Sequence, residues 1–122
     1  MKCDIRITEK AAQDISEAAD YIEFILLNPE AADKLIEAVE TEIDKLATMP
    51  ERHSVVNDPV LETWEIRMIV INNYIAFYTI NEKERTVNII RFLYGKRNWI
   101  AILSNDSSKA DWTVAVQREK KE

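Results

Sequence analysis

The sequence predicts one α+β domain, in which an N-terminal strand and an antiparallel helix hairpin precede an antiparallel three-stranded meander that completes one sheet, followed by a short C-terminal helix. Apolar residues alternate with polar ones over residues 2–7, recur with helical spacing over residues 9–49, and form strand-like runs over residues 61–94. The 122 residues suffice for one core. We expect the folded domain in residues 1–103 and a tail of uncertain order in residues 104–122.

The helix hairpin is predicted from the signals at the ends of its helices. Thr8 suits the N-cap of a helix that runs to about Leu27, because its hydroxyl can accept a hydrogen bond from the first turn. Asn28 and Pro29 end this helix and begin a second one that runs to about Met49, since Asn favours the N-cap and Pro the first helical position. So short a connection makes the two helices antiparallel.

Two turns divide the second half of the chain into strands at about residues 61–71, 74–80 and 86–94. The first turn, Asn72-Asn73, suits a two-residue hairpin because asparagine tolerates left-handed backbone conformations. The second turn, residues 81–85, is longer and does not fix the register of the last strand.

The cations of the sheet are the candidates for chemistry. The first turn sets Arg67 opposite Tyr78, and we favour the register of the last strand that places Arg91 beside them; a one-residue shift would place Ile90 and Phe92 there instead. One concave end of the sheet would then carry Arg67, Arg91, Lys96 and Arg97. Such a cluster could stabilise a phosphorane-like transition state. Alternatively, the arginines bind loop carbonyls and the acids of the helix hairpin.

Residues 91–103 are the most informative segment. The strand ends at Tyr94, and Gly95, the only glycine of the chain, begins a turn with two cations. Tyr94 could transfer a proton if those cations lowered its pKa from about 10. We expect the segment after the turn to form a helix, and the apolar residues that dock it on the sheet to be Trp99, Ile100 and Leu103.

Charge and composition limit the function classes. Residues 1–50 carry 12 acids and 5 bases, residues 51–103 carry 6 and 7, and residues 104–122 carry 4 and 4, so the net charge of −6 lies in the helical half. We expect weak direct binding to free nucleic acid. The single cysteine cannot form an internal disulfide, and the apolar runs are too short for a bilayer and not preceded by a signal peptide, which favours a cytoplasmic location without membrane contact. Without a His/Cys cluster, we expect no metal or cofactor.

The turn Tyr-Gly-Lys-Arg-Asn-Trp at residues 94–99 resembles the closing motif of the RelE/ParE family of bacterial toxins. The resemblance covers roughly residues 2–103, including Ile-Thr-Glu-Lys-Ala from residue 7 and Asn-Pro-Glu-Ala-Ala from residue 28. It implies the strand, hairpin and sheet described above, and a small antitoxin that wraps the toxin. RelE-like members cut mRNA in the ribosomal A site without a metal, whereas ParE-like members poison DNA gyrase.

The same resemblance assigns candidate residues. A RelE-like ribonuclease would use Arg67, Arg91 and Tyr94 in catalysis, whereas the residues expected to bind the target are Arg91, Lys96, Arg97 and Trp99. Residues 51–66 offer no lysine, and this departure, the net acidity and the closing turn favour the ParE-like branch. The sequence therefore predicts a gyrase-directed toxin with an antitoxin partner. The alternatives are a RelE-like ribosome-associated endoribonuclease and an inactive relative that only binds its antitoxin.

Overall fold

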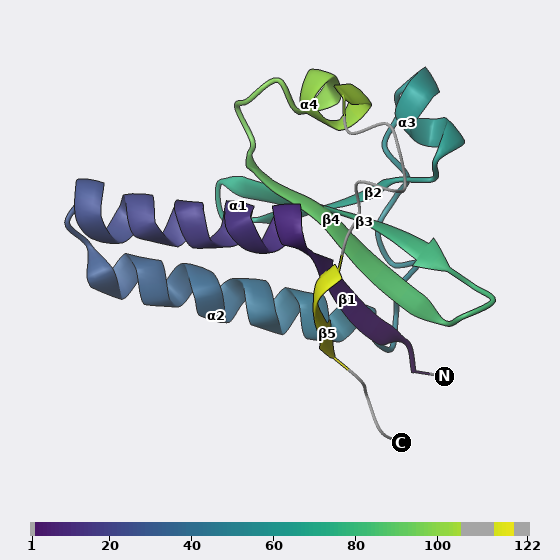
Figure 1. Ribbon diagram of the computed structural model, residues 1–122, viewed down its shortest axis with the longest axis horizontal. Helices are drawn as coiled ribbons and strands as arrows, with labels where there is room; N and C mark the ends of the chain where they lie inside the picture. Colours follow the sequence, from purple (N-terminus) through teal and green to yellow (C-terminus); the bar gives the residue numbers. More distant parts are fainter. Residues whose placement is uncertain (1, 106–113, 119–122) are drawn as a thin grey trace.

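The computed structural model describes residues 2–105 and 114–118, which form a mixed sheet with the helix hairpin on one face and two short helices on the other (Figure 1). The strand order is β2-β3-β4-β1-β5, with β1 parallel to β4 and the other pairs antiparallel. The elements are β1 (Asp4–Thr8), α1 (Glu9–Asp20), η1 (Tyr21–Ile25), α2 (Pro29–Leu46), α3 (Pro59–Thr63), β2 (Arg67–Ile71), β3 (Tyr74–Asn81), β4 (Thr86–Tyr94), α4 (Trp99–Asn105) and β5 (Val114–Arg118). The predicted α+β fold is confirmed.

The predicted helix caps are present. The Thr8 side chain accepts a hydrogen bond from the Ala11 amide at 3.2 Å, and the Asn28 side chain accepts one from the Ala31 amide at 3.1 Å. The first helix differs from the prediction in its last turn, because η1 widens into a π-helix before Leu27 adopts a left-handed backbone (φ 53°). This wider turn ends the helix just before the second cap and brings the two helices side by side.

The sheet separates two apolar cores. Its hairpin face buries the side chains of Ile5, Leu35, Ile43, Tyr78 and Ile89 among others. Its opposite face buries Leu61, Ile66, Phe77, Ile90, Leu93 and Leu103 beneath α3 and α4. Both faces of β3 and β4 are therefore covered, which explains their nearly continuous apolar sequences.

One predicted strand boundary was wrong. The strand predicted to begin near residue 61 begins at Arg67, because Pro59–Thr63 forms α3. Asp58 caps this helix by accepting hydrogen bonds from the amides of Val60 and Leu61, both at 3.1 Å. Asp-Pro at this helix start is the same signal as Asn28-Pro29, and it overrides the strand propensity of the residues that follow.

The register of β4 also differs from the favoured one. Arg67 lies opposite Tyr78 as predicted, but Tyr78 pairs with Ile89 and Phe77 pairs with Arg91. A β-bulge at this point inserts Ile90 between the two pairs, so Arg91 does not lie beside Arg67 and Tyr78. The predicted cationic row across the sheet is therefore wrong.

The C-terminal helix docks through a different set of residues than expected. Leu103 is buried, and the partly buried Trp99 packs its ring 5.4 Å from that of Phe77. Ile100 is 40% exposed, so its predicted docking is wrong; a residue one position after Trp99 lies about 100° around the helix. In the tail, β5 pairs with β1, while Trp112 lies outside the described residues.

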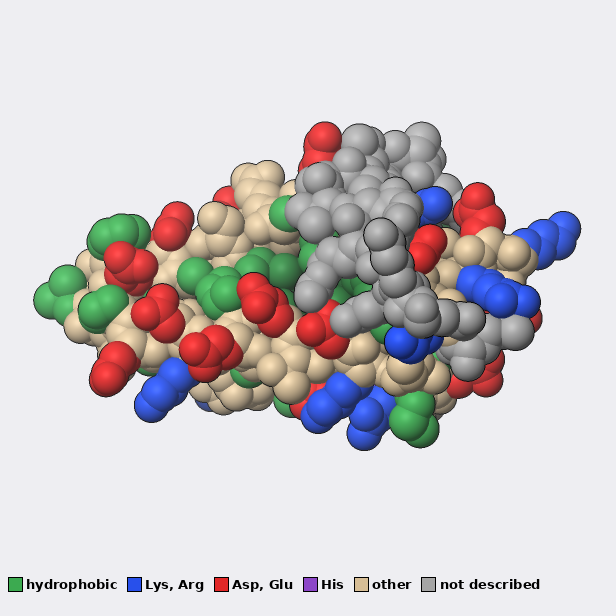
Figure 2. All heavy atoms as spheres, turned by 90° about the horizontal axis from the view of Figure 1, so that it is seen from below, with side chains coloured by type: hydrophobic (Ala, Val, Ile, Leu, Met, Phe, Trp, Pro, Cys, Tyr) green, Lys and Arg blue, Asp and Glu red, His purple; other side chains and the backbone are tan. Residues whose placement is uncertain are grey.

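Hydrophobic side chains gather on the surface at the end of the helix hairpin, with acidic side chains around them (Figure 2). The exposed fractions along this stretch are 51% for Tyr21, 63% for Phe24, 65% for Ile25, 56% for Leu26 and 80% for Leu27. We call residues 21–27 the hairpin tip. Several large apolar side chains exposed together, rather than singly, indicate a contact surface.

Candidate partner-binding groove

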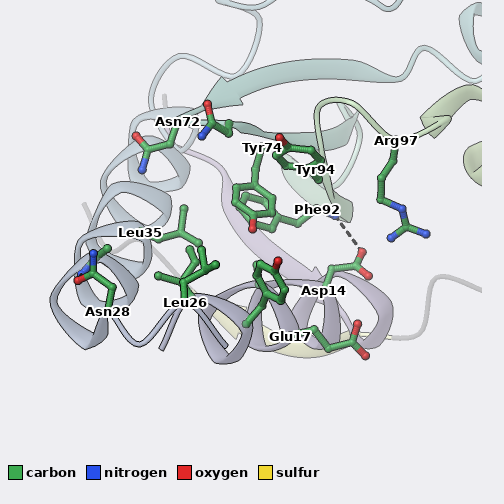
Figure 3. Close-up of a pocket in the computed structure, with 15 residues that line it drawn as sticks. Asp14, Glu17, Leu26, Asn28, Leu35, Asn72, Tyr74, Phe92, Tyr94 and Arg97 are labelled. Atoms are coloured by element: carbon green, nitrogen blue, oxygen red, sulfur yellow. Dashed lines mark hydrogen bonds between the residues drawn. The ribbon is translucent and has the colours of Figure 1, made fainter. Parts of the chain in front are cut away.

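A groove of about 830 Å³ separates the end of the helix hairpin from the end of the sheet (Figure 3). One wall comes from α1, η1 and α2, and the other from the β2–β3 turn, the end of β4 and the loop before α4. The lining residues are Asp14, Glu17, Ala18, Tyr21, Ile22, Leu26, Asn28, Ala31, Leu35, Asn72, Asn73, Tyr74, Phe92, Tyr94 and Arg97. The groove thus continues onto the hairpin tip through Tyr21 and Leu26.

Three aromatic rings form the sheet wall of this groove. Tyr74 stacks on Phe92 with the ring centroids 5.0 Å apart and the planes at 10°, and Tyr94 meets Tyr74 edge-on at 5.7 Å. Cross-strand pairing of Tyr74 with Tyr94 produces this arrangement. Burial, assisted by the neighbouring Tyr94 and Tyr21, raises the pKa of Tyr74, so its phenol is neutral near pH 7. The wall offers apolar area and hydroxyl groups that form hydrogen bonds.

Asp14 joins the helix wall to the sheet wall. Its carboxylate accepts hydrogen bonds from Arg91 Nε at 2.7 Å and Nη2 at 3.0 Å, and one from the Phe92 amide at 3.0 Å. The two side chains are only 10% and 15% exposed. The chain leaves the sheet after Thr8, so on the β1 side the described residues place no strand beside the end of β4, whose other side pairs with β3. The Thr8 hydroxyl, which donates to the Ile90 carbonyl at 3.1 Å, and Asp14 bind the freed backbone groups instead.

Arg67 binds the loop between α2 and α3. Its Nη1 atom donates hydrogen bonds to the carbonyls of His53 and Glu51, while the Tyr78 hydroxyl donates to the Pro50 carbonyl at 2.8 Å. The His53 ring meets the Tyr78 ring edge-on at 6.5 Å, and burial, followed by the charge of Arg52, lowers the pKa of His53. These contacts correspond to the alternative considered above, in which the sheet arginines bind loop carbonyls and hairpin acids.

The three residues assigned to catalysis are not brought together. Arg67 pairs with Tyr78 and Tyr94 pairs with Tyr74. These positions are four residues apart on β3, or about 13 Å at the rise of a β-strand. Arg91 lies between these levels, with its guanidinium on Asp14. The three side chains therefore form no common constellation for proton transfer and phosphate binding.

The four residues assigned to target binding also separate. In the closing turn the Gly95 amide donates to the Asn73 carbonyl at 2.8 Å, and a Cβ on Gly95 would lie 3.2 Å from that carbonyl oxygen. Only a residue without a side chain fits this approach of the two turns easily. Arg97 lines the groove, Lys96 is exposed on the same turn, Arg91 binds Asp14, and Trp99 packs on the far face of the sheet.

Sequence reasoning missed the main lining of the groove. Tyr21 and Leu26 were counted as parts of a helix, and Tyr74 as a strand residue. A usable signal was present in the Tyr-Ile-Glu-Phe-Ile-Leu-Leu run at residues 21–27, where apolar residues occupy every side of the helix and one face alone cannot bury them.

Across residues 2–105 and 114–118, no helix is long and apolar enough to span a bilayer. The same residues contain no group of three or more His, Cys, Asp or Glu side chains arranged to hold a metal ion.

Comparison with known proteins finds one matching family and several similar structures. The chain matches the model of the ParE toxin of type II toxin–antitoxin systems (parDE) over residues 5–99. Its structure is similar to one from the chromosomal ParDE system of P. aeruginosa (TM-score 0.61, 18% identity, 76% of this chain and 96% of the other). It is also similar to one from the RelBE2 toxin–antitoxin complex of Mycobacterium tuberculosis (TM-score 0.55, 20% identity, 77% and 99%). A comparison with curated proteins finds no match.

The two structural likenesses establish the fold, and the family match extends over most of the strand, hairpin and meander that build the groove. The chain therefore belongs to the ParE toxin family of type II toxin–antitoxin systems.

Proposed function

We propose that this chain is a cytoplasmic, gyrase-directed toxin that is neutralised by an antitoxin segment bound in the groove and on the hairpin tip. One observation carries the antitoxin site: the groove, walled by Tyr74, Phe92 and Tyr94, runs into a tip with five large exposed apolar side chains. An amphipathic helix that lays its apolar face in a groove is a recurring mode of peptide recognition. The dimensions and lining suit such a segment.

Charge specifies the segment further. Residues 1–50, which include the helix wall and the tip, carry a net charge of −7. Among them, Glu17 lines the groove, and its carboxylate accepts a hydrogen bond from the Gln13 amide side chain at 2.9 Å. A segment with apolar anchors and flanking Lys or Arg residues complements this surface, and such complementarity raises association rates and rejects acidic competitors.

Gyrase is the better-supported target because the geometry gives little support to RNA cleavage. Arg67 binds loop carbonyls, Arg91 binds Asp14, and Tyr94 stands on the aromatic wall at the other end of the sheet. A ribonuclease needs its proton-transfer group and its phosphate-binding cations within reach of one phosphodiester.

The target is tested by inducing the chain in bacteria and following plasmid supercoiling and protein synthesis in parallel. We expect loss of supercoiling, with gyrase-dependent DNA breaks, before translation falls. Purified chain should also inhibit supercoiling by purified gyrase. Cleavage of ribosome-bound mRNA, with supercoiling intact, would refute the gyrase assignment in favour of the ribonuclease.

The antitoxin site is tested by placing a charge in the groove. Leu26→Glu should weaken binding of the antitoxin encoded beside this gene by at least tenfold, because the carboxylate must be desolvated against the aromatic wall. Val60→Glu, at another exposed apolar residue (49%) on α3, is the matched control and should bind normally. Equal affinity of the two variants, measured by calorimetric titration, would rule out the groove as the antitoxin site.

A further inference from the structure

The C-terminal strand β5 occupies the outer edge of β1. The pairing is antiparallel and runs from Ile5 opposite Arg118 to Thr8 opposite Val114, with an irregular step between Ile7 and Thr8. The other edge of β1 is used by β4 (Figure 1). Without β5, β1 would be an edge strand, whose unpaired backbone groups accept an extended peptide from another chain.

β5 lies beyond the part of the chain that matches the family, which ends at residue 99. The two toxin–antitoxin structures match over 96% and 99% of their own chains while covering only 76% and 77% of this one. β5 thus belongs to a C-terminal portion of this chain that lies outside the family match, whereas most of the other helices and strands lie within it.

We propose that β5 is an intramolecular competitor of the antitoxin: it occupies the β1 edge to which an extended antitoxin segment would otherwise add as a strand. This inference rests on the proposed function. The β1 edge takes a strand by backbone pairing, as β5 shows, and this mode of recognition accepts many sequences. The antitoxin must displace β5 to use the edge, so the toxin's own tail regulates its neutralisation.

The edge lies within reach of a segment bound in the groove. α1 follows β1 directly, contacts β5, and contributes Asp14 and Glu17 to the groove. Its 12 residues span about 18 Å at the helical rise. About six extended residues cover that distance. One antitoxin chain can therefore occupy the groove with a helix and continue along α1 to the β1 edge.

The competition is suited to regulation because β5 is short but tethered. It has five residues and an irregular register, so few backbone pairs must be exchanged. β5 belongs to the same chain as β1, so its pairing is intramolecular and does not depend on the concentration of the protein. The antitoxin can use the edge only in molecules whose β5 is open. Its apparent dissociation constant is therefore the intrinsic one divided by the fraction of molecules with β5 open.

The test uses three forms of the chain and the antitoxin encoded beside its gene. The first is the full chain and the second ends at Asn105. The third carries Arg6→Cys and Gln117→Cys with Cys3→Ala; residues 6 and 117 are directly opposite across the β1–β5 pair, where Cα separations suit a disulfide. The oxidised form holds β5 on the edge, and the same protein after reduction is its control.

We expect the truncated chain to bind the antitoxin at least tenfold tighter than the full chain, and the oxidised form at least tenfold weaker than its reduced form. Equal antitoxin affinities of the double-cysteine variant before and after reduction would overturn the proposal. This comparison does not involve the truncated chain, so it remains decisive if that chain fails to fold. If no form binds the antitoxin, the proposed function itself is wrong. If Leu26→Glu abolishes binding while the oxidised form binds normally, the groove is correct and only the β1 edge is rejected.

Discussion

Removal of the Asp14 carboxylate should destabilise the fold far more than its position on an outer helix suggests. The carboxylate accepts three hydrogen bonds, two from Arg91 and one from the Phe92 amide, at 10% and 15% exposure of the paired side chains. Asp14→Ala leaves a largely buried guanidinium without this carboxylate and a β4 amide without its acceptor. Breaking a buried pair from one side costs about 3–5 kcal/mol, and the remaining exposure places our expectation near the lower figure, at about 3 kcal/mol.

Urea denaturation measures this loss in the free energy of unfolding, provided that the slope of that free energy against urea concentration is the same for all variants. Glu17→Ala is the matched control, on the exposed side of the same helix, and should cost about 0.5 kcal/mol or less. In a double-mutant cycle, Asp14→Ala with Arg91→Ala should cost less than the sum of the single changes, because each single change already removes the interaction between the two side chains. A loss below about 1 kcal/mol for Asp14→Ala, or strict additivity, would refute the reasoning.

Three further outcomes follow from the described contacts. Trp99→Ala should cost about 2–3 kcal/mol, below the value for a fully buried ring, while Ile100→Ala should cost under about 0.5 kcal/mol; the reverse order in chemical denaturation would contradict the placement of α4. The pKa of His53 is lowered in the fold, so its contribution to stability is present above pH 6.5 and is lost as the pH falls below it. His53→Gln should flatten that part of the stability profile, and an unchanged slope would contradict it. The raised pKa of the buried Tyr78 predicts stability that is present below pH 10 and lost above it. Tyr78→Phe should reduce this alkaline loss.

The helices were predictable because their signals are local. Thr8 and Asn28 each cap a helix with the side-chain contact that the sequence indicates, and Asn72-Asn73 turns as its composition predicts, with Asn72 at φ 55°. Each of these outcomes depends on residues within about four positions of one another. Asp58-Pro59 carries the same kind of signal, and α3 was missed because the residues after it also suit a strand.

The position of Arg91 was not predictable in this way. Alternation along β4 places every second residue on one face, but the bulge between the Phe77 and Tyr78 pairings shifts that pattern by one residue. A bulge is settled by what each face of the strand contacts. Ile89 and Phe92 both belong to the hairpin-side core although they are three positions apart. Only the packing of the whole sheet against α1 determines where such an insertion falls.

The end of β1 and the contacts of Asp14 shape the groove. β1 ends at Thr8, so on that side the last part of β4 has α1 beside it, and its backbone is held there by the Thr8 hydroxyl and the Asp14 carboxylate. Fixing the Phe92 amide to Asp14 fixes the ring on which Tyr74 stacks, and the pairing of Tyr74 with Tyr94 then sets the third ring. The polar contact between Asp14 and β4 therefore sets the distance between the helix wall and the aromatic wall. Arg91, which the sequence placed in a candidate catalytic cluster, thus acts through Asp14 to fix the two walls of the groove.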